Sequence, residues 1–118
     1  MLCCFTVLAT TAQTKAHINR KTKDFDLIAS MRLDHKIFGY ELPSVNSKKM
    51  ILFSVFTKDV KGNPNKCPLG SYYQTLDLNE GDKIMYVSAT ADFVKLNYID
   101  SVNKTTIFYI RCKFVVFD

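Results

Sequence analysis

The sequence predicts an all-β protein, a single small domain of six or seven antiparallel strands in a meander that forms a small barrel or a sandwich. Three observations predict this class. Residues 24–34 alternate between polar and apolar side chains with a period of two. Short runs rich in β-branched and aromatic residues recur between turn residues through the second half of the chain. No segment after Met50 carries the apolar stripe of an amphipathic helix.

Length and composition favour one folded domain. The chain has 118 residues, of which 47% are hydrophobic and 13% aromatic, as in a globular protein rather than a disordered one. No apolar run approaches the roughly 20 residues that a membrane-spanning helix needs. We therefore expect no membrane span.

Residues 1–12 have features of a signal peptide. The segment is apolar from Met1 to Ala9, and Thr10 and Ala12 place small side chains at positions −3 and −1 of a cleavage before Gln13. The TTAQ ending resembles the signal-peptide ends of many Gram-negative secreted proteins. Because the apolar stretch is short and no basic residue precedes it, the signal would be truncated at its start, or these residues would form a buried first strand. The first alternative predicts a periplasmic or secreted protein.

The number of cysteines in the mature chain depends on that cleavage. The mature chain, residues 13–118, would keep only Cys67 and Cys112. An even pair in an exported protein predicts one disulfide, which would stabilise the fold by about 4 kcal/mol on the chain-entropy model. The alternative is two thiols, with Cys112 buried as a small apolar group.

The net charge of +5 is concentrated in part near the start of the chain. Four cations precede the first acid, Asp24: Lys15, Arg20, Lys21 and Lys23. We expect residues 13–23 to be a basic, solvated and frayed terminus. The alternative is that this basic segment contacts an anionic surface or nucleic acid.

Two strands and a short extended piece are predicted before the long loop. In residues 24–34 the apolar side chains occupy every second position: Phe25, Leu27, Ala29, Met31 and Leu33. Residues 36–43 form an extended piece that Gly39 interrupts and Pro43 ends. Residues 50–58 are apolar on both faces, which predicts a central strand that is covered on both sides.

Four further strands follow. Residues 71–76 form one, and residues 83–89 are again apolar on both faces. In 93–99 the residues Val94, Leu96 and Tyr98 share one face, opposite Phe93, Lys95 and Asn97. In 105–118 one face of the strand is an apolar row, whose members are Phe108, Ile110, Cys112, Phe114 and Val116. Tyr109, Arg111 and Lys113 point to the opposite face. Strands with two apolar faces need cover from barrel closure, a second sheet or a homodimer.

The loop FTKDVKGNPNKCPLGSYYQT, residues 56–75, is the first candidate site. It is longer than a tight hairpin requires, and such loops are commonly functional. Five residues are candidates for binding a partner: Asp59, Asn63, Asn65, Tyr72 and Tyr73. The two tyrosines point to opposite faces of a strand, so one enters the core and the other faces outward. The alternative is a purely structural connection.

Residues for catalysis or metal binding are sparse. The histidines are His17 and His35, and no glycine-flanked serine or cysteine elbow accompanies them. Asp24 and Asp26 alternate on the predicted polar face, as an outward charge row. No zinc, EF-hand or phosphate-loop pattern is present in the sequence, so we expect no metal and no cofactor.

These observations predict a small exported, non-catalytic β domain that binds another protein or a cell-envelope component. One alternative is an oligonucleotide-binding barrel whose basic and aromatic strand face comprises Lys95, Tyr109, Arg111 and Lys113, beside Phe93. An exported protein meets little nucleic acid, which favours the first prediction. The other alternative is a small hydrolase, whose site would gather His35, Asp34 or Asp59 with a hydroxyl.

Overall fold

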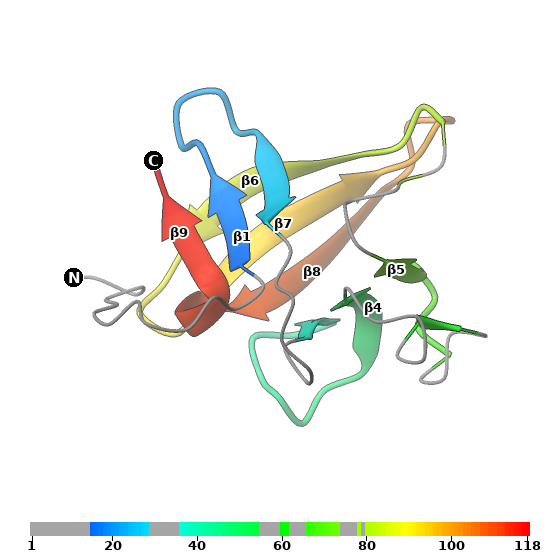
Figure 1. The fold of residues 1–118 in the computed structure, drawn as a ribbon, viewed down its shortest axis with the longest axis horizontal. Helices are drawn as coiled ribbons and strands as arrows, with labels where there is room; N and C mark the ends of the chain where they lie inside the picture. The colour runs from blue at the N-terminus through cyan, green and yellow to red at the C-terminus, as the bar shows by residue number, and fades with distance from the viewer. Residues whose placement is uncertain (1–14, 29–35, 55–59, 62–65, 74–77, 79) are drawn as a thin grey trace.

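The structure is a computed structural model that describes residues 15–28, 36–54, 60–61, 66–73, 78 and 80–118. These residues contain nine strands in two sheets (Figure 1). The six-stranded sheet has the order β5-β4-β3-β8-β7-β6 and the three-stranded sheet the order β2-β1-β9. The all-β prediction is confirmed, and the arrangement fits a sandwich, because the barrel is not closed.

The strands have the following bounds. They are β1 (Lys15–Ile18), β2 (Phe25–Ile28), β3 (Ile37–Tyr40), β4 (Lys49–Ser54), β5 (Ser71–Tyr73), β6 (Lys83–Ala89), β7 (Phe93–Ile99), β8 (Thr105–Arg111) and β9 (Val115–Phe117). A 3₁₀ turn, η1 (Cys112–Phe114), joins β8 to β9.

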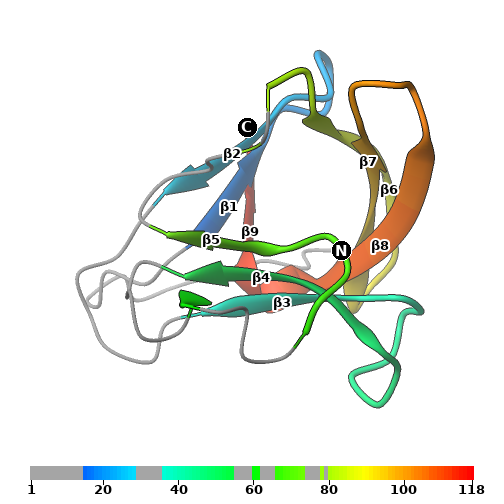
Figure 2. The same ribbon diagram turned by 90° about the vertical axis from the view of Figure 1, so that its right-hand side faces the viewer.

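The two sheets enclose one core (Figure 2). The alternating apolar residues of β7 point into it, and Val94, Leu96 and Tyr98 are buried as predicted. Phe53 lies at its centre, with ring centroids 5.5 Å from Phe25 and 6.3 Å from Phe108. The sheets also meet at an edge, where an isolated bridge pairs Asp24 of the β1–β2 turn with Met85 of β6.

The topology differs from the predicted meander of six or seven antiparallel strands in three pairings. β3 pairs with β8, which is far from it in the sequence. β5 pairs in parallel with β4, and β1 pairs in parallel with β9. A parallel neighbour requires the chain to cross back, which explains why the connection from β4 to β5 is longer than a hairpin. Strands β6, β7 and β8 do form the expected antiparallel meander.

The prediction that residues 13–23 form a frayed basic terminus is wrong for the described part, residues 15–23. Lys15–Ile18 is the middle strand of the three-stranded sheet, and Ala16 and Ile18 are fully buried. The cations of the turn that follows lie against rings: the Arg20 guanidinium is 4.6 Å from the Phe117 ring centroid, and the Lys23 ammonium is 5.8 Å from that of Tyr86. This segment is therefore integrated into the domain.

The strand predicted over residues 24–34 is confirmed in its first part. Phe25 and Leu27 are buried and Asp26 between them is exposed, in β2. Residues 29–34 of that prediction lie outside the described residues.

The predicted two-faced strands have different positions. β4 is interior to the six-stranded sheet, and all of its residues from Met50 to Ser54 are buried, as expected. β6 instead forms the edge of the same sheet; only Ile84 is buried in it, and Val87 is exposed. An apolar pattern on both faces thus did not distinguish a central strand from an edge strand.

The predicted last strand is interrupted. Phe108, Ile110 and Cys112 are buried as expected, but η1 then shifts the alternation, so that Val115 is buried while Phe114 and Val116 are only partly so. The turn moves the chain from one sheet to the other.

Among the described residues, no helix combines the length and apolar character needed to cross a membrane.

Candidate basic–aromatic binding face

The surface of β7 and β8 that points away from the core alternates cations with aromatic rings. Lys95 is the Cα partner of Tyr109, and Phe93 is the partner of Arg111. Phe93, Lys95 and Tyr109 are half-buried, and Arg111 is exposed. The antiparallel register sets each cation beside a ring on the neighbouring strand, at a cross-strand separation where side chains interact. We call the outward surface of β3, β8 and β7 the outer face.

Strand β3 extends this surface with two more rings and a cation. Tyr40 is the Cα partner of Tyr109 on one side and of Lys49 on the other. The ring of Phe38 lies 6.4 Å from that of Tyr40, and the Lys49 ammonium lies 5.1 Å from the Phe38 ring centroid. At that distance the ammonium is attracted to the π face of the ring.

Tyr40 lies deeper than the other residues of the outer face. Burial raises the pKa of its phenol above the ordinary value, and the positive charge of Arg111 opposes this by favouring the phenolate. The phenol therefore stays neutral at physiological pH. The opposing effect of Arg111 also indicates that its guanidinium lies near the Tyr40 side chain.

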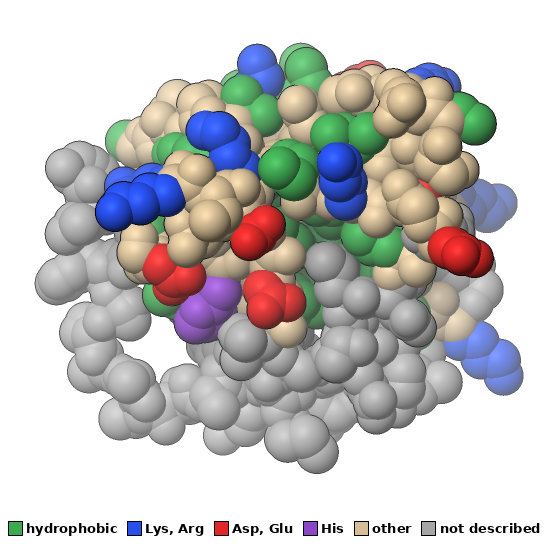
Figure 3. Space-filling model, turned by 90° about the horizontal axis from the view of Figure 1, so that it is seen from above, with side chains coloured by type: hydrophobic (Ala, Val, Ile, Leu, Met, Phe, Trp, Pro, Cys, Tyr) green, Lys and Arg blue, Asp and Glu red, His purple; other side chains and the backbone are tan. Residues whose placement is uncertain are grey.

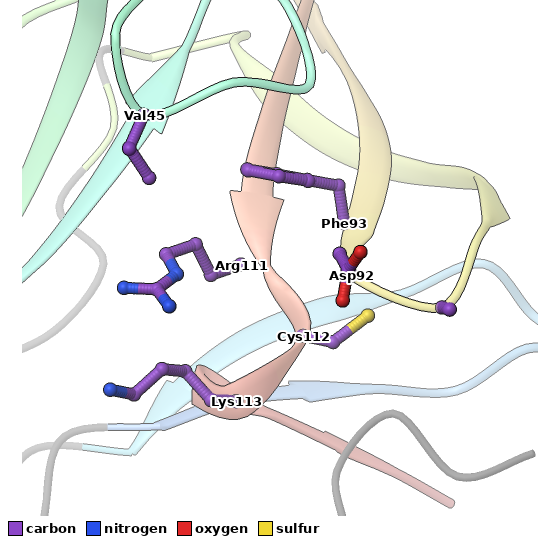
Figure 4. Close-up of a pocket in the computed structure, with 7 residues that line it drawn as sticks. Val45, Asp92, Phe93, Arg111, Cys112 and Lys113 are labelled. Atoms are coloured by element: carbon purple, nitrogen blue, oxygen red, sulfur yellow. The ribbon is translucent and has the colours of Figure 1, made fainter.

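A pocket of about 300 Å³ opens at the end of the outer face where β8 passes into η1. Its lining residues are Val45, Ala91, Asp92, Phe93, Arg111, Cys112 and Lys113. Figure 4 shows Arg111 and Lys113 extending to the side on which Val45 lies, while the Cys112 side chain points the other way. Two cations, one carboxylate and apolar side chains thus line an open depression.

The structure therefore brings together the residues of the oligonucleotide alternative. Lys95, Tyr109 and Arg111 share the outer face, and Lys113 joins Arg111 at the pocket. The Lys113 ammonium also lies 5.3 Å from the ring centroid of Phe114.

Of the five candidates in the long loop, the structure describes the side chain of Tyr72. Asp59, Asn63 and Asn65 lie outside the described residues, as does the side chain of Tyr73. Tyr72 is the member of the tyrosine pair that enters the core: it is 7% exposed and stacks on Phe53 at 5.7 Å between ring centroids. Tyr72 is thus a core residue and not a surface for a partner.

The predicted disulfide between Cys67 and Cys112 is not formed. Cys67 is a thiol with 3% exposure, and burial raises its pKa, although the nearby Lys49 charge partly offsets this. Cys112 is disulfide-bonded, and its partner lies outside the described residues. The prediction failed because cysteine spacing cannot specify which two Cβ atoms come within bonding range.

A second pocket, of about 390 Å³, lies where β2 meets β6. Its lining includes the carboxylates Asp24, Asp26 and Asp82. His17 is the cross-strand partner of Asp26, and Figure 3 shows carboxylates beside the histidine on this side of the molecule. Within the described part of the chain, no group of three or more His, Cys, Asp or Glu residues is arranged to hold a metal ion.

His35, Asp34 and Asp59, around which the catalytic alternative would be assembled, lie outside the described residues. Asp24 and Asp26, expected on an outward polar face, are exposed. Asp82 was not singled out from the sequence, and its carboxylate accepts a 2.6 Å hydrogen bond from the Tyr98 hydroxyl.

Sequence reasoning missed Phe38, Tyr40 and Lys49 as members of the outer face. A signal was present, because Phe38 and Tyr40 flank Gly39 at alternate positions of an extended segment. Their position beside Tyr109 depends on the pairing of β3 with β8, two strands far apart in the sequence.

Comparisons with protein-family models, curated proteins and solved structures find no match for this chain.

Proposed function

We propose that this protein is a non-catalytic β domain that binds an anionic partner, a protein or an envelope component, through its outer face. One observation carries the proposal: the register between β7 and β8 sets Lys95 beside Tyr109 and Arg111 beside Phe93. A surface that interleaves cations with half-buried rings offers charge, hydrogen-bond donors and apolar contact to a ligand. The net charge of +5 favours the approach of an anion.

Rigid placement of these side chains supports a recognition role. They project from paired strands whose opposite face forms the core, so their backbone positions are held by the sheet. A ligand would then cost little ordering of the protein on binding. A surface on a loop would lack this advantage, and the outer face is therefore preferred over the loop at 56–75.

The non-catalytic part of the proposal is supported by the state of the other polar groups. The Asp82 carboxylate is engaged by Tyr98, and Tyr98 is only 5% exposed. His17 belongs to the middle strand of the small sheet and is half-buried. Neither arrangement offers a nucleophile beside a base, as hydrolytic chemistry requires.

Export to the periplasm or outside the cell remains part of the proposal. It rests on the signal-peptide features of residues 1–12, an apolar stretch followed by the small side chains of Thr10 and Ala12 before Gln13. The oligonucleotide alternative uses the same outer face, so both ligand classes can be compared with the same variants.

The proposal is tested by the salt concentration that elutes the protein from immobilised heparin, a polyanion without nucleic-acid bases. The double variant Arg111→Ala/Lys95→Ala is expected to elute at clearly lower salt than the unchanged protein. The matched control Lys21→Ala/Lys104→Ala removes two exposed cations elsewhere on the surface and should cause a smaller shift. Equal shifts for the two pairs would show that only net charge matters and would refute a specific face.

A fluorescent single-stranded oligonucleotide that binds more tightly than heparin, with the same dependence on Lys95 and Arg111, would favour the oligonucleotide alternative.

A further inference from the structure

The loop between β3 and β4 exposes two aliphatic side chains next to the cations of the pocket. Leu42 is 56% exposed and Val45 is 46% exposed, while Val45 lines the pocket together with Arg111 and Lys113. The loop thus presents exposed aliphatic surface beside the cations of the pocket, and burying that surface against a partner would be favourable. We call Leu42, Val45, Lys48, Lys49, Arg111 and Lys113 the basic–apolar rim.

The loop has internal hydrogen bonds that hold it in shape. The Glu41 amide donates to the Lys48 carbonyl at 2.9 Å, and the Leu42 amide donates to the Ser47 hydroxyl oxygen at 3.1 Å. That hydroxyl in turn donates to the Ser44 carbonyl at 2.7 Å. Leu42 and Val45 are therefore presented by a defined loop, whose own polar groups are largely satisfied without a ligand.

Cations lie in and beside the loop that carries the two aliphatic residues. Lys48 and Lys49 end the loop, and Lys49 is the Cα partner of Tyr40. The Lys15 ammonium donates to the Lys113 carbonyl at 3.0 Å, which adds a further positive charge at η1. The acids at this end among the described residues are Glu41, in the loop, and Asp92, in the pocket lining. Positive charge thus predominates around the rim.

We infer that the basic–apolar rim docks the protein on the surface of an anionic lipid bilayer, an inference that rests on the proposed function and specifies its partner. Leu42 and Val45 would enter the boundary between head groups and acyl chains, and the lysines and Arg111 would contact lipid phosphates and carboxylates. Apolar side chains flanked by cations are the pattern that binds such interfaces, because apolar burial and attraction to anionic lipid act together.

The limited exposure of the aromatic rings favours a membrane over single-stranded nucleic acid as the partner. Binding of bases requires open ring faces on which to stack. Tyr40 is only 9% exposed, the Lys49 ammonium lies 5.1 Å from the Phe38 ring centroid, and Phe93 and Tyr109 are half-buried. Aliphatic side chains such as Leu42 and Val45 contribute little to base stacking, whereas a bilayer interface accepts them.

Co-sedimentation of the full chain with lipid vesicles tests the inference. The protein is expected to bind vesicles of phosphatidylcholine mixed with phosphatidylserine, to bind phosphatidylcholine alone much less, and to be released by high salt. Leu42→Ser/Val45→Ser and Arg111→Glu/Lys113→Glu should each reduce the partition coefficient by about tenfold. The matched control Val102→Ser/Lys104→Glu changes an aliphatic residue with 78% exposure and a cation in the β7–β8 hairpin, at the other end of these strands, and should bind as the unchanged protein does.

Three results would overturn the inference: no binding to the anionic vesicles, binding that is unchanged in Leu42→Ser/Val45→Ser, or an equal loss in the control pair. Circular dichroism of each variant verifies that the fold is retained, and all of the substituted side chains are exposed at the surface. If vesicles are not bound while heparin retention still depends on Lys95 and Arg111, the membrane inference fails and the proposed function stands. If neither is bound, both fail.

Discussion

The hydroxyl of Tyr98 donates a 2.6 Å hydrogen bond to Oδ2 of Asp82 inside the sandwich. The same hydroxyl lies 3.0 Å from that of Tyr72, which is 3.0 Å from the Leu69 carbonyl. Tyr72 is in β5 and Tyr98 in β7, and β4, β3 and β8 lie between these strands in the sheet order. The six-stranded sheet must therefore curl until two strands that are not neighbours meet across its inner face.

Tyr98→Phe is expected to lower the free energy of unfolding by about 1–3 kcal/mol, because it removes the donor to Asp82 and a partner of Tyr72 in the interior. Urea denaturation followed by circular dichroism measures the change. The control is Tyr109→Phe on the outer face, which should change stability by less than about 0.5 kcal/mol. Equal effects of the two variants would contradict a role for this network in stability.

Stability should decline in alkali as Tyr98 ionises. Burial raises the pKa of its phenol, and the hydrogen bonds with Asp82 and Tyr72 raise it further. Because the folded state holds this proton more tightly than the unfolded state, the contribution is complete below the unfolded pKa of about 10 and is lost as the pH rises through the folded pKa. Urea midpoints measured at increasing pH should therefore fall above about pH 10, and fall less steeply in Tyr98→Phe. Identical alkaline profiles for the two proteins would exclude Tyr98 as a cause.

Gly39→Ala should destabilise the protein by about 1–3 kcal/mol through overpacking. A Cβ at this position would meet the Phe108 ring, and would lie 2.5 Å from Cγ2 of Ile51. The double variant Gly39→Ala/Ile51→Leu tests the cause, because leucine lacks the Cγ2 methyl branch on Cβ that the new methyl group would meet. A double variant no more stable than the sum of the two single effects would show that Ile51 is not the obstacle.

Alkylation and peptide mass mapping should distinguish the two cysteines. Cys67 is expected to react only after unfolding, because its sulfur is buried and burial raises its pKa, whereas Cys112 should react only after reduction. A peptide pair linking Cys67 to Cys112 would contradict the structure.

The same mapping on protein secreted by its native host also tests the predicted signal peptide. Cleavage after Ala12 would remove Cys3 and Cys4. Once residues 1–12 are lost and Cys67 is reduced, Cys112 has no other cysteine of the chain with which to form a disulfide. The intramolecular disulfide and the cleavage therefore exclude each other. Intact mass reports both events in one measurement.

The sequence alone determined the β class and the inward residues of single strands. Val94, Leu96 and Tyr98 are buried as their spacing predicted, and Lys95, Tyr109 and Arg111 lie on the opposite face. These features follow from local geometry, since successive side chains of any extended chain point to opposite sides.

Only the tertiary structure decided which strands became neighbours. It placed Lys15–Ile18 in the middle of a sheet, paired β5 in parallel with β4, and set Tyr40 beside Tyr109. It also changed the alternation at η1, so that Val115 rather than Val116 is buried. The physical reason is that strand pairing and disulfide bonding depend on which distant segments meet around the shared core, and the period of a single strand carries no information about its partners.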